Sequence, residues 1–235
     1  MRAFIYLVQV RDAAWHASGP LAPAPSVAAP PSPPGLGARA PRVHIMNTHF
    51  FSQLMGSSGS YEQRSARYDF AAVRTWTAPR ALGRTGQSAP SPLDCDAIVV
   101  PVNLPGHWVC AAIDLRFRRF FFFDSMGQRR ADVLEALARW VEDESRDGGF
   151  KNKPPREPID TSEWAFVMPG GETPQQENCN DCGVFTLIFA DFMARGLSPL
   201  AEEGDAGRFP DCLSQANMDY FRARIARDII RERAE

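Results

Sequence analysis

The stretch Gln-Glu-Asn-Cys-Asn-Asp-Cys-Gly at residues 176–183 (QENCNDCG) places Cys179 and Cys182 three positions apart, directly before an apolar segment. Such a pair can form part of a metal clip or a redox pair, or one cysteine can be a nucleophile beside a bystander. A zinc site needs two further ligands, and the only close histidine pair, His44 and His49, is distant in the sequence. A redox pair usually occurs in a βαβ pattern that continues for a long stretch after the two cysteines, and the chain after Cys182 is shorter than that.

The third interpretation makes Cys182 a nucleophile at the start of a helix. A helix N-terminus and a nearby imidazolium both stabilise a thiolate. Gln176, six residues upstream, can donate from its side-chain amide to an oxyanion, together with the backbone N–H of Cys182. Gly183 allows backbone and substrate to approach closely. In this interpretation Cys179 is the bystander.

Length, charge and cysteine content bound the class of protein. A chain of 235 residues with 44% hydrophobic content is expected to form one domain plus a tail. The net charge of −2 provides no global field for nucleic acid or an anionic membrane, so neither partner is expected. The five cysteines are odd in number and scattered, which favours a reducing, intracellular compartment over a disulfide framework.

The chain divides near residue 42. Residues 1–42 include a stretch rich in proline and alanine that cannot bury enough apolar surface to offset its ordering entropy. We expect this part to be a disordered leader. From Val43 to Glu235 the composition is that of a globular domain.

Hydrophobic periodicity predicts both helices and strands. Apolar spacing predicts a helix over 44–55 that stops at Gly56 and a short helix over 70–76, with a loop over 77–92. Strands are predicted at 97–103, 107–115, 118–126 and 164–168. Further helices are predicted after Gly127, over 183–195 with a stop at Gly196, and from about Asn217. This order favours an α+β domain over a regular βαβ repeat.

Two of the predicted strands bring a histidine and an aspartate together. A hairpin centred on Leu115 and Arg116 would place His107 opposite Asp124 and Trp108 opposite Phe123. Directly opposed residues lie close enough for an imidazole and a carboxylate to share a hydrogen bond. Such an aspartate fixes the tautomer of the histidine and stabilises its charged form, but the pair alone also fits a purely structural contact. A thiol on the other side of the ring would make the pair catalytic.

Three short motifs follow one another along the chain: His107-Trp108 followed by Ile113-Asp114, then Phe123-Asp124-Ser125-Met126-Gly127, then Gln176-x-Asn178-x-x-Asp181-Cys182-Gly183. Together they resemble the papain-like, SUMO-specific (sentrin-specific, ubiquitin-like protein-specific) cysteine proteases. Weaker likeness extends to VHIMNTHFF, to VRTWT at 73–77 and to NMDYFRARI near the end, which are most similar to the nucleolar branch of the family. The resemblance implies a papain-like fold with a mixed central sheet flanked by helices.

The resemblance also assigns a role to each candidate residue. It implies His107 as general base and acid, Asp124 as its orienting partner, Cys182 as nucleophile and Gln176 as oxyanion donor. Trp108 would roof the narrow channel through which a Gly-Gly tail enters. The implied activity is hydrolysis after the C-terminal Gly-Gly of SUMO, in deconjugation or precursor maturation, and it needs no metal or cofactor.

The resemblance has one gap. Family members carry a Trp-Leu-Asn-Asp-like segment shortly before the region that corresponds to HIMNTHFF, whereas this chain has the Pro/Ala-rich leader there; Trp15 lies too far upstream to replace it. SUMO or SUMO-conjugated proteins are the expected partners of a monomeric enzyme in the nucleus or nucleolus, with the cytoplasm as the alternative. The same chemistry on NEDD8 or another ubiquitin-like modifier, and an inactive SUMO-binding module, remain alternatives.

Overall fold

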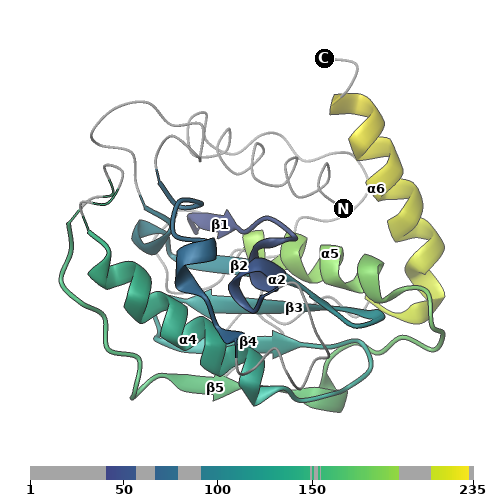
Figure 1. The fold of residues 1–235 in the computed structure, drawn as a ribbon. Helices are drawn as coiled ribbons and strands as arrows, with labels where there is room; N and C mark the ends of the chain where they lie inside the picture. Colours follow the sequence, from purple (N-terminus) through teal and green to yellow (C-terminus); the bar gives the residue numbers. More distant parts are fainter. Residues whose placement is uncertain are drawn as a thin grey trace.

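The computed structural model describes residues 41–56, 67–78, 91–148, 150, 153, 155–195 and 213–232. Three predictions therefore lie wholly or largely outside the described residues: the leader over 1–42, most of the loop over 77–92 and the helix stop at Gly196. A central sheet with helices on both faces organises the described part of the chain (Figure 1).

Five strands form the sheet in the order β1-β2-β3-β4-β5. Their bounds are β1 Val43–Ile45, β2 Ala97–Leu104, β3 His107–Asp114, β4 Arg119–Phe123 and β5 Ala165–Val167. The two outer pairs are parallel and the two inner pairs are antiparallel. The predicted α+β class with a mixed sheet is confirmed.

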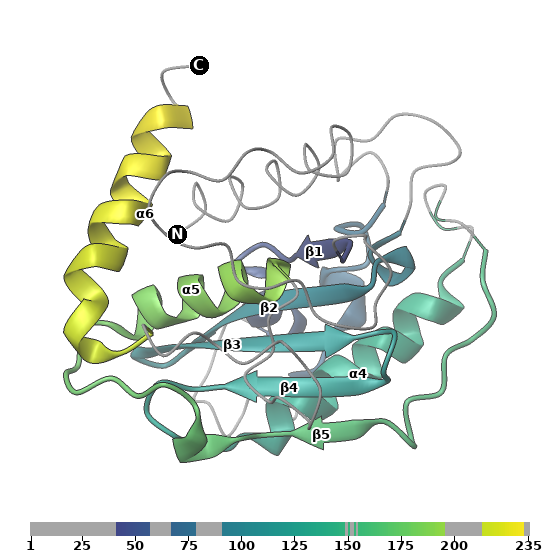
Figure 2. The same cartoon turned by 180° about the vertical axis from the view of Figure 1, so that it is seen from behind.

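Helices cover the two faces of the sheet, as the two opposite views show (Figures 1 and 2). One face carries α2 (Phe50–Leu54) and α4 (Ala131–Arg146), and the other carries α5 (Cys182–Ala194) with α6 (Met218–Glu232). Short 3₁₀ helices occur at Phe70–Ala72, Pro92–Asp94, Gly170–Glu172 and Gln215–Asn217. No helix in the described ranges is both long and apolar enough to cross a membrane.

The helix α5 is almost entirely apolar, and its one charged residue, Asp191, is fully buried, so the helix lies in the interior rather than on the surface. Phe185, Ile188 and Phe189 pack in one cluster with side chains of the sheet, and Phe221 of α6 packs in the same cluster. Because this packing holds α5 from two sides, its first residue, Cys182, has a fixed position relative to the strands.

The first predicted helix is wrong over its N-terminal half. Residues Val43–Ile45 form β1, which pairs in parallel with Ala97–Val99, and the Met46 N–H donates to the Val99 carbonyl at 2.8 Å. The helix begins only at Phe50. A distant strand supplies the hydrogen bonds of β1, and local periodicity does not reveal such a partner. The helix predicted over 70–76 is reduced to a 3₁₀ turn at Phe70–Ala72.

The predicted hairpin register is also wrong, by two residues. Ala111 pairs with Phe122 and Cys110 with Phe123, so Phe123 does not lie opposite Trp108 as predicted. The turn between β3 and β4 spans residues 115–118 instead of two residues. Its longer form is stabilised by the carboxylate of Asp114, which accepts from the N–H groups of residues 116 and 117 at 3.1 and 3.2 Å.

A buried ion cluster ties α4 to the segment that follows it. The ammonium of Lys153 is 4% exposed and donates to Glu144 at 2.8 Å and to Asp147 at 3.0 Å. Thr77 donates to the other oxygen of Glu144 at 2.6 Å. Burial raises the pKa of Glu144 even though these donors oppose the effect. Removing the ammonium would leave the buried carboxylate of Glu144 without a cation, while Asp147 would keep only its ion pair with Arg74 at 2.6 Å.

We therefore expect Lys153→Met to lower the free energy of unfolding by about 3 to 5 kcal/mol, measured by urea denaturation. The control is Arg227→Met, which removes an exposed pair with Asp228 and should cost less than about 1 kcal/mol. Equal losses in the two variants would contradict a structural role for the buried cluster.

Candidate active site

The turn between β2 and β3 sets the position of His107. Pro105 and Gly106 form a two-residue turn in which Gly106 has φ of 71°, a left-handed conformation that glycine adopts without strain. His107 is thereby the first residue of β3 and pairs with Leu104 of β2. Its side chain is buried, with 9% of the residue exposed.

His107 and Asp124 form a direct contact at this end of the sheet. The distance from Nε2 of His107 to Oδ1 of Asp124 is 2.6 Å. Asp124 follows the last residue of β4 and is 1% exposed, and its Oδ1 also accepts from the Met126 N–H at 2.7 Å. The predicted contact is confirmed although the register is not, because a two-residue shift keeps both side chains on the same face of the sheet.

The carboxylate decides which nitrogen of the ring carries the proton. An ionised carboxylate only accepts hydrogen bonds, so Nε2 of the neutral imidazole must hold the hydrogen. Nδ1 is then an acceptor and can take a proton from an acid on the other side of the ring. This is the division of labour that a general base requires.

Cys182 is the first residue of α5, with Asp181 as the N-cap. It is 8% exposed, and Gly183 beside it is only half-buried. A thiolate here would lie at the positive end of the helix dipole and next to unpaired backbone N–H groups of the first turn. Cys110 differs, because complete burial strongly raises the pKa of its thiol and leaves it unsuited to act as a nucleophile.

The loop before α5 is joined to the turn that holds Asp124. The Gln176 N–H donates to the carbonyl of Ser125 at 2.8 Å, and the Ser125 hydroxyl donates to Oε1 of Gln176 at 2.6 Å. Nε2 of Gln176 donates to the carbonyl of Asn178. Because an amide nitrogen carries two hydrogens, one remains for another acceptor. The serine thus fixes which end of the Gln176 amide is the donor.

Gln175 makes a second bridge between the same two segments. Its Nε2 donates to the carbonyl of Thr173 at 2.7 Å and to that of Asp124 at 3.3 Å. Gly127 has φ of 70°, and a Cβ at that position would meet Oε1 of Gln175 at 2.9 Å. The left-handed backbone therefore favours glycine at 127, and a larger residue would also displace the end of the Gln175 side chain.

Asp181 is the most heavily bonded side chain of the site. It is 3% exposed and accepts from Asn178 and Gln215, each at 2.7 Å, and from Nε of Arg222 at 3.0 Å. Burial alone would raise the pKa of this carboxyl, but the donors Gln215, Asn178 and Arg222 outweigh it and the pKa lies below the usual range. Asp181 is therefore a carboxylate at neutral pH.

Trp108 lies on the side of the sheet that carries Cys182. Alternation along β3 gives it the same face as Cys110 and Ala112, which pack in the cluster of α5. Trp108 is half-buried rather than enclosed, so part of its ring is available to a ligand. This placement fits the roof predicted from the resemblance.

Hydrogen bonds bring three of the four predicted catalytic residues into one network, and Cys182 is the exception. His107 contacts Asp124 directly, and Gln176 is joined to the next residue, Ser125. In the described part of the chain no hydrogen bond joins Sγ of Cys182 to His107. Cys179 is exposed. Among the described residues, no three histidine, cysteine or acidic side chains gather in a way that could hold a metal ion.

Six residues of this network have no assigned role in the sequence interpretation: Ser125, Gln175, Asn178, Asp181, Gln215 and Arg222. Three of them stand beside predicted site residues: Ser125 after Asp124, Gln175 before Gln176 and Asp181 before Cys182. That proximity was the available signal. Gln215 and Arg222 carry no such signal, because they reach the site only through the packing of α6 against α5.

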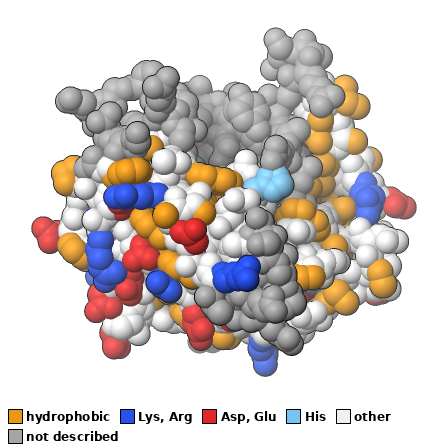
Figure 3. All heavy atoms as spheres, viewed as in Figure 1, with side chains coloured by type: hydrophobic (Ala, Val, Ile, Leu, Met, Phe, Trp, Pro, Cys, Tyr) orange, Lys and Arg blue, Asp and Glu red, His pale blue; other side chains and the backbone are white. Residues whose placement is uncertain are grey.

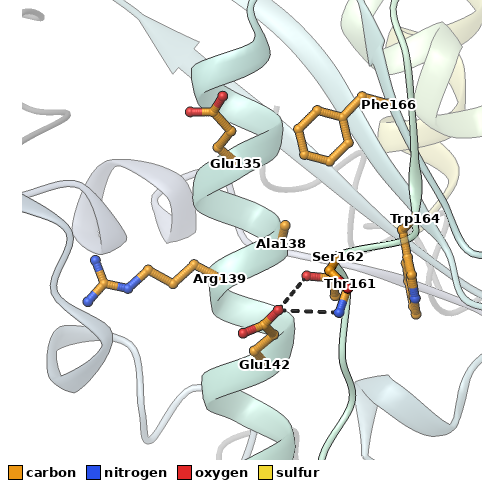
Figure 4. Close-up of a pocket in the computed structure, with 8 residues that line it drawn as sticks. All are labelled: Glu135, Ala138, Arg139, Glu142, Thr161, Ser162, Trp164 and Phe166. Atoms are coloured by element: carbon orange, nitrogen blue, oxygen red, sulfur yellow. Dashed lines mark hydrogen bonds between the residues drawn. The ribbon is translucent and has the colours of Figure 1, made fainter.

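A separate hollow of about 540 Å³ lies between α4 and the segment 161–166 (Figure 4). Glu142 stands in its wall and accepts from the N–H and the hydroxyl of Thr161 at 3.2 and 2.7 Å. None of the predicted catalytic residues lines it. Basic and acidic side chains are interspersed on this side of the molecule (Figure 3).

The fold and the cysteine at the helix N-terminus define a class of protein. Residues 37–235 match the model of the Ulp1 protease family, C-terminal catalytic domain. This chain belongs to the Ulp1 protease family, and its catalytic domain is that of a cysteine protease.

Curated relatives agree with that family. The chain is 35% identical over 196 residues to the ubiquitin-like-specific protease ESD4 of Arabidopsis thaliana, covering 83% of this chain and 33% of the relative. It is 28% identical over 193 residues to sentrin-specific protease 2 of Homo sapiens, covering 82% of this chain and 26% of the relative. The chain thus spans about a third or less of these relatives.

Solved structures share the fold. The C-terminal Ulp1 protease domain in complex with Smt3, the yeast orthologue of SUMO, aligns with a TM-score of 0.55 at 20% identity, over 83% of this chain and 71% of that one. The catalytic domain of the Ulp1-like SUMO protease of Chaetomium thermophilum aligns with a TM-score of 0.53 at 22% identity, over 95% and 67% of the two chains.

The contact between His107 and Asp124 predicts one tautomer. Nitrogen-15 NMR of the neutral ring should show the hydrogen on Nε2, and Asp124→Ala should give a mixture of both tautomers because the acceptor is gone. His49, which is exposed and away from Asp124, serves as the internal control. A hydrogen on Nδ1 in the unsubstituted protein would contradict the geometry.

Proposed function

We propose that this domain hydrolyses the bond after the C-terminal Gly-Gly of SUMO, through Cys182, His107, Asp124 and Gln176. The observation that carries the proposal is the 2.6 Å contact between His107 and Asp124 at the end of the sheet where α5 begins with Cys182. The relatives named as ubiquitin-like-specific and sentrin-specific proteases, and the Ulp1 domain solved with Smt3, support this class of substrate.

In the first half of the reaction, Nδ1 of His107 accepts the thiol proton of Cys182. The thiolate attacks the carbonyl carbon of the terminal glycine and forms a tetrahedral intermediate. As this intermediate collapses, the lysine or peptide amine leaves with the proton from His107, and a thioester remains on Cys182. Asp124 stabilises the imidazolium that exists between the two proton transfers.

The oxyanion of the intermediate is stabilised by neutral donors. The free hydrogen on Nε2 of Gln176 and the backbone N–H of Cys182 are the two groups proposed for this role. Ser125 holds Oε1 of Gln176, so the nitrogen end is already oriented before the substrate binds. Because the donor is already oriented, no free energy is needed to reorient it in the transition state.

In the second half, water hydrolyses the thioester. Nδ1 of His107 removes a proton from the water, which attacks the carbonyl carbon, and the thiolate of Cys182 leaves and is reprotonated. The products are the modifier with a free C-terminal carboxylate and the free amine. The same cycle serves deconjugation and precursor maturation, which differ only in the leaving amine.

Selectivity for Gly-Gly follows from the roof that we propose for Trp108. Only glycine can pass close beneath a flat indole ring, so side chains at the last two positions of a substrate are excluded sterically. NEDD8 or another ubiquitin-like modifier with the same ending could use the channel too, and the surface that distinguishes these modifiers lies outside it. A nuclear or nucleolar location and a monomeric state stay predictions.

The function is tested with SUMO that carries a C-terminal electrophile. The protein should form a covalent adduct at Cys182, detected by peptide mass spectrometry, and should cleave a SUMO precursor. Cys182→Ala should lose cleavage by at least about 10³-fold, since the nucleophile is gone. A panel with NEDD8 and ubiquitin probes ranks the modifiers.

Cys179→Ser is the matched control for that experiment. The nucleophile interpretation expects nearly full cleavage in this variant, whereas a redox pair expects a loss as large as that of Cys182→Ser. SUMO binding that survives Cys182→Ala without any turnover by the unsubstituted protein would instead identify an inactive binding module.

The proposed roof predicts a change in selectivity. Trp108→Ala should lower the ratio of kcat/KM for a Gly-Gly ending to kcat/KM for a Gly-Ala ending by about tenfold, because the ring no longer excludes the alanine side chain. Both endings are measured with the same SUMO precursor. An unchanged ratio would show that Trp108 does not line the channel.

A further inference from the structure

The carboxylate of Asp181 lies next in sequence to the nucleophile that we propose, and the mechanism above gives it no role. A carboxylate beside Cys182 opposes the negative charge of a thiolate through simple repulsion. The helix N-terminus and His107 favour that charge. A reactive thiolate at Cys182 therefore requires that the negative charge of the Asp181 carboxylate be compensated by a positive charge nearby.

Two residues from the C-terminal elements provide that balance. Arg222 on α6 donates to Oδ1 of Asp181 through both Nε and Nη2, a charge-assisted contact in which two N–H groups share one carboxylate oxygen. Gln215 donates to Oδ2 at 2.7 Å, and its own Oε1 accepts from the Glu177 N–H at 2.9 Å. Arg222 thus compensates the negative charge of Asp181, and Gln215 joins Asp181 to the loop that carries Gln176.

We propose that Arg222 and Asp181 form a positioning pair, in which the C-terminal helix neutralises the carboxylate beside Cys182 and so preserves the reactivity of its thiolate. The proposal rests on the proposed role of Cys182 as nucleophile. Asp181 is almost completely buried in this arrangement, whereas the side chain of Arg222 is 47% exposed. Dissolved ions can therefore screen the ion pair only from the exposed side of Arg222.

Other titratable groups belong to the segments around this end of α5 and set the background for the pair. They are His107 at the start of β3, the buried thiol of Cys110 on β3, Asp124 after β4, Asp219 of α6, Glu177 and the thiol of Cys179. In β1, His44 alternates with Val43 and Ile45, which pack in the cluster of α5, so it points to the opposite face. None of these groups supplies the positive charge that Arg222 provides next to the carboxylate of Asp181.

A second pair between the same two helices offers a matched control. Arg224 of α6 donates to Asp191 of α5 at 2.8 Å, and Asp191 lies nine residues beyond Cys182. Both arginines dock α6 onto α5, but only Arg222 acts beside the thiol. A purely structural function of the salt bridges would make the two substitutions equivalent in their effect on Cys182.

The test measures the rate at which iodoacetamide alkylates Cys182, as a function of pH, by peptide mass spectrometry in a Cys179→Ser background. Arg222→Met should move the midpoint of this pH profile upward by about half a unit to one unit, because the carboxylate is left unbalanced. Asp181→Asn should move it downward, because the arginine is then unopposed. The double variant should return close to the starting profile.

Opposite signs in the two single variants are a result that loss of structure cannot produce. Arg222→Lys keeps the charge and should leave the midpoint almost unchanged, and Arg224→Met should not move it at all. The proposal is overturned if Arg222→Met leaves the midpoint unchanged, if Asp181→Asn raises it, or if Arg224→Met raises it equally. If Arg222→Met does not fold, the sign for Asp181→Asn decides the question.

The alkylation assay uses no modifier, so its result is separate from that of the SUMO cleavage assay. A protein that shows the opposite shifts but cleaves no SUMO would support the pair and contradict the proposed substrate. A protein that cleaves SUMO without the shifts would support the function and contradict the pair.

Discussion

The burial of α5 against the sheet is the interaction on which the site depends. This helix is almost entirely apolar, so it is stable only where β-strands cover one side and α6, which also pairs with its one charged residue, Asp191, covers another. Such burial fixes the depth and direction of the helix. Its N-terminus therefore lies at a defined place, and the first residue, Cys182, needs no further side-chain anchor of its own.

Around that end of α5, hydrogen bonds replace apolar packing as the source of order. The carboxylate of Asp124 holds His107, the hydroxyl of Ser125 holds Gln176, and Asp181 gathers donors from the loop and from α6. Each contact fixes the orientation of a polar group that packing alone would leave free to rotate. The site is thus a polar network of loops and strand ends, supported by a rigid apolar layer.

Much of this arrangement could be predicted from the sequence, since the signals were local. Alternation and β-branched content indicate four of the five strands, β2 to β5, and the apolar run after Cys182 indicates α5. Two of the misses have one physical cause. The strand β1 and the role of Arg222 depend on partners distant in the sequence, which no local pattern specifies. The longer turn before β4 is instead set locally, by N–H groups that donate to the carboxylate of Asp114.

The contact between His107 and Asp124 was nevertheless predicted correctly from a wrong register. A shift by two residues preserves the face of a strand, and the side chain of Asp124 reaches diagonally past the end of β4 to the ring. Face is therefore a safer prediction than exact pairing. For a catalytic pair at the end of a sheet, the face matters more than which residues are directly opposite.

The central claim is that Cys182 attacks a carbonyl whose oxyanion is held by Gln176 and by the start of α5. The most direct measurement is a crystal structure of the protein bound to SUMO that ends in a glycine aldehyde. We predict a hemithioacetal on Sγ of Cys182 whose oxygen lies about 2.7 to 3.1 Å from Nε2 of Gln176 and from the backbone N of Cys182. An adduct at Cys179, or an oxygen that points away from Gln176, would contradict the account.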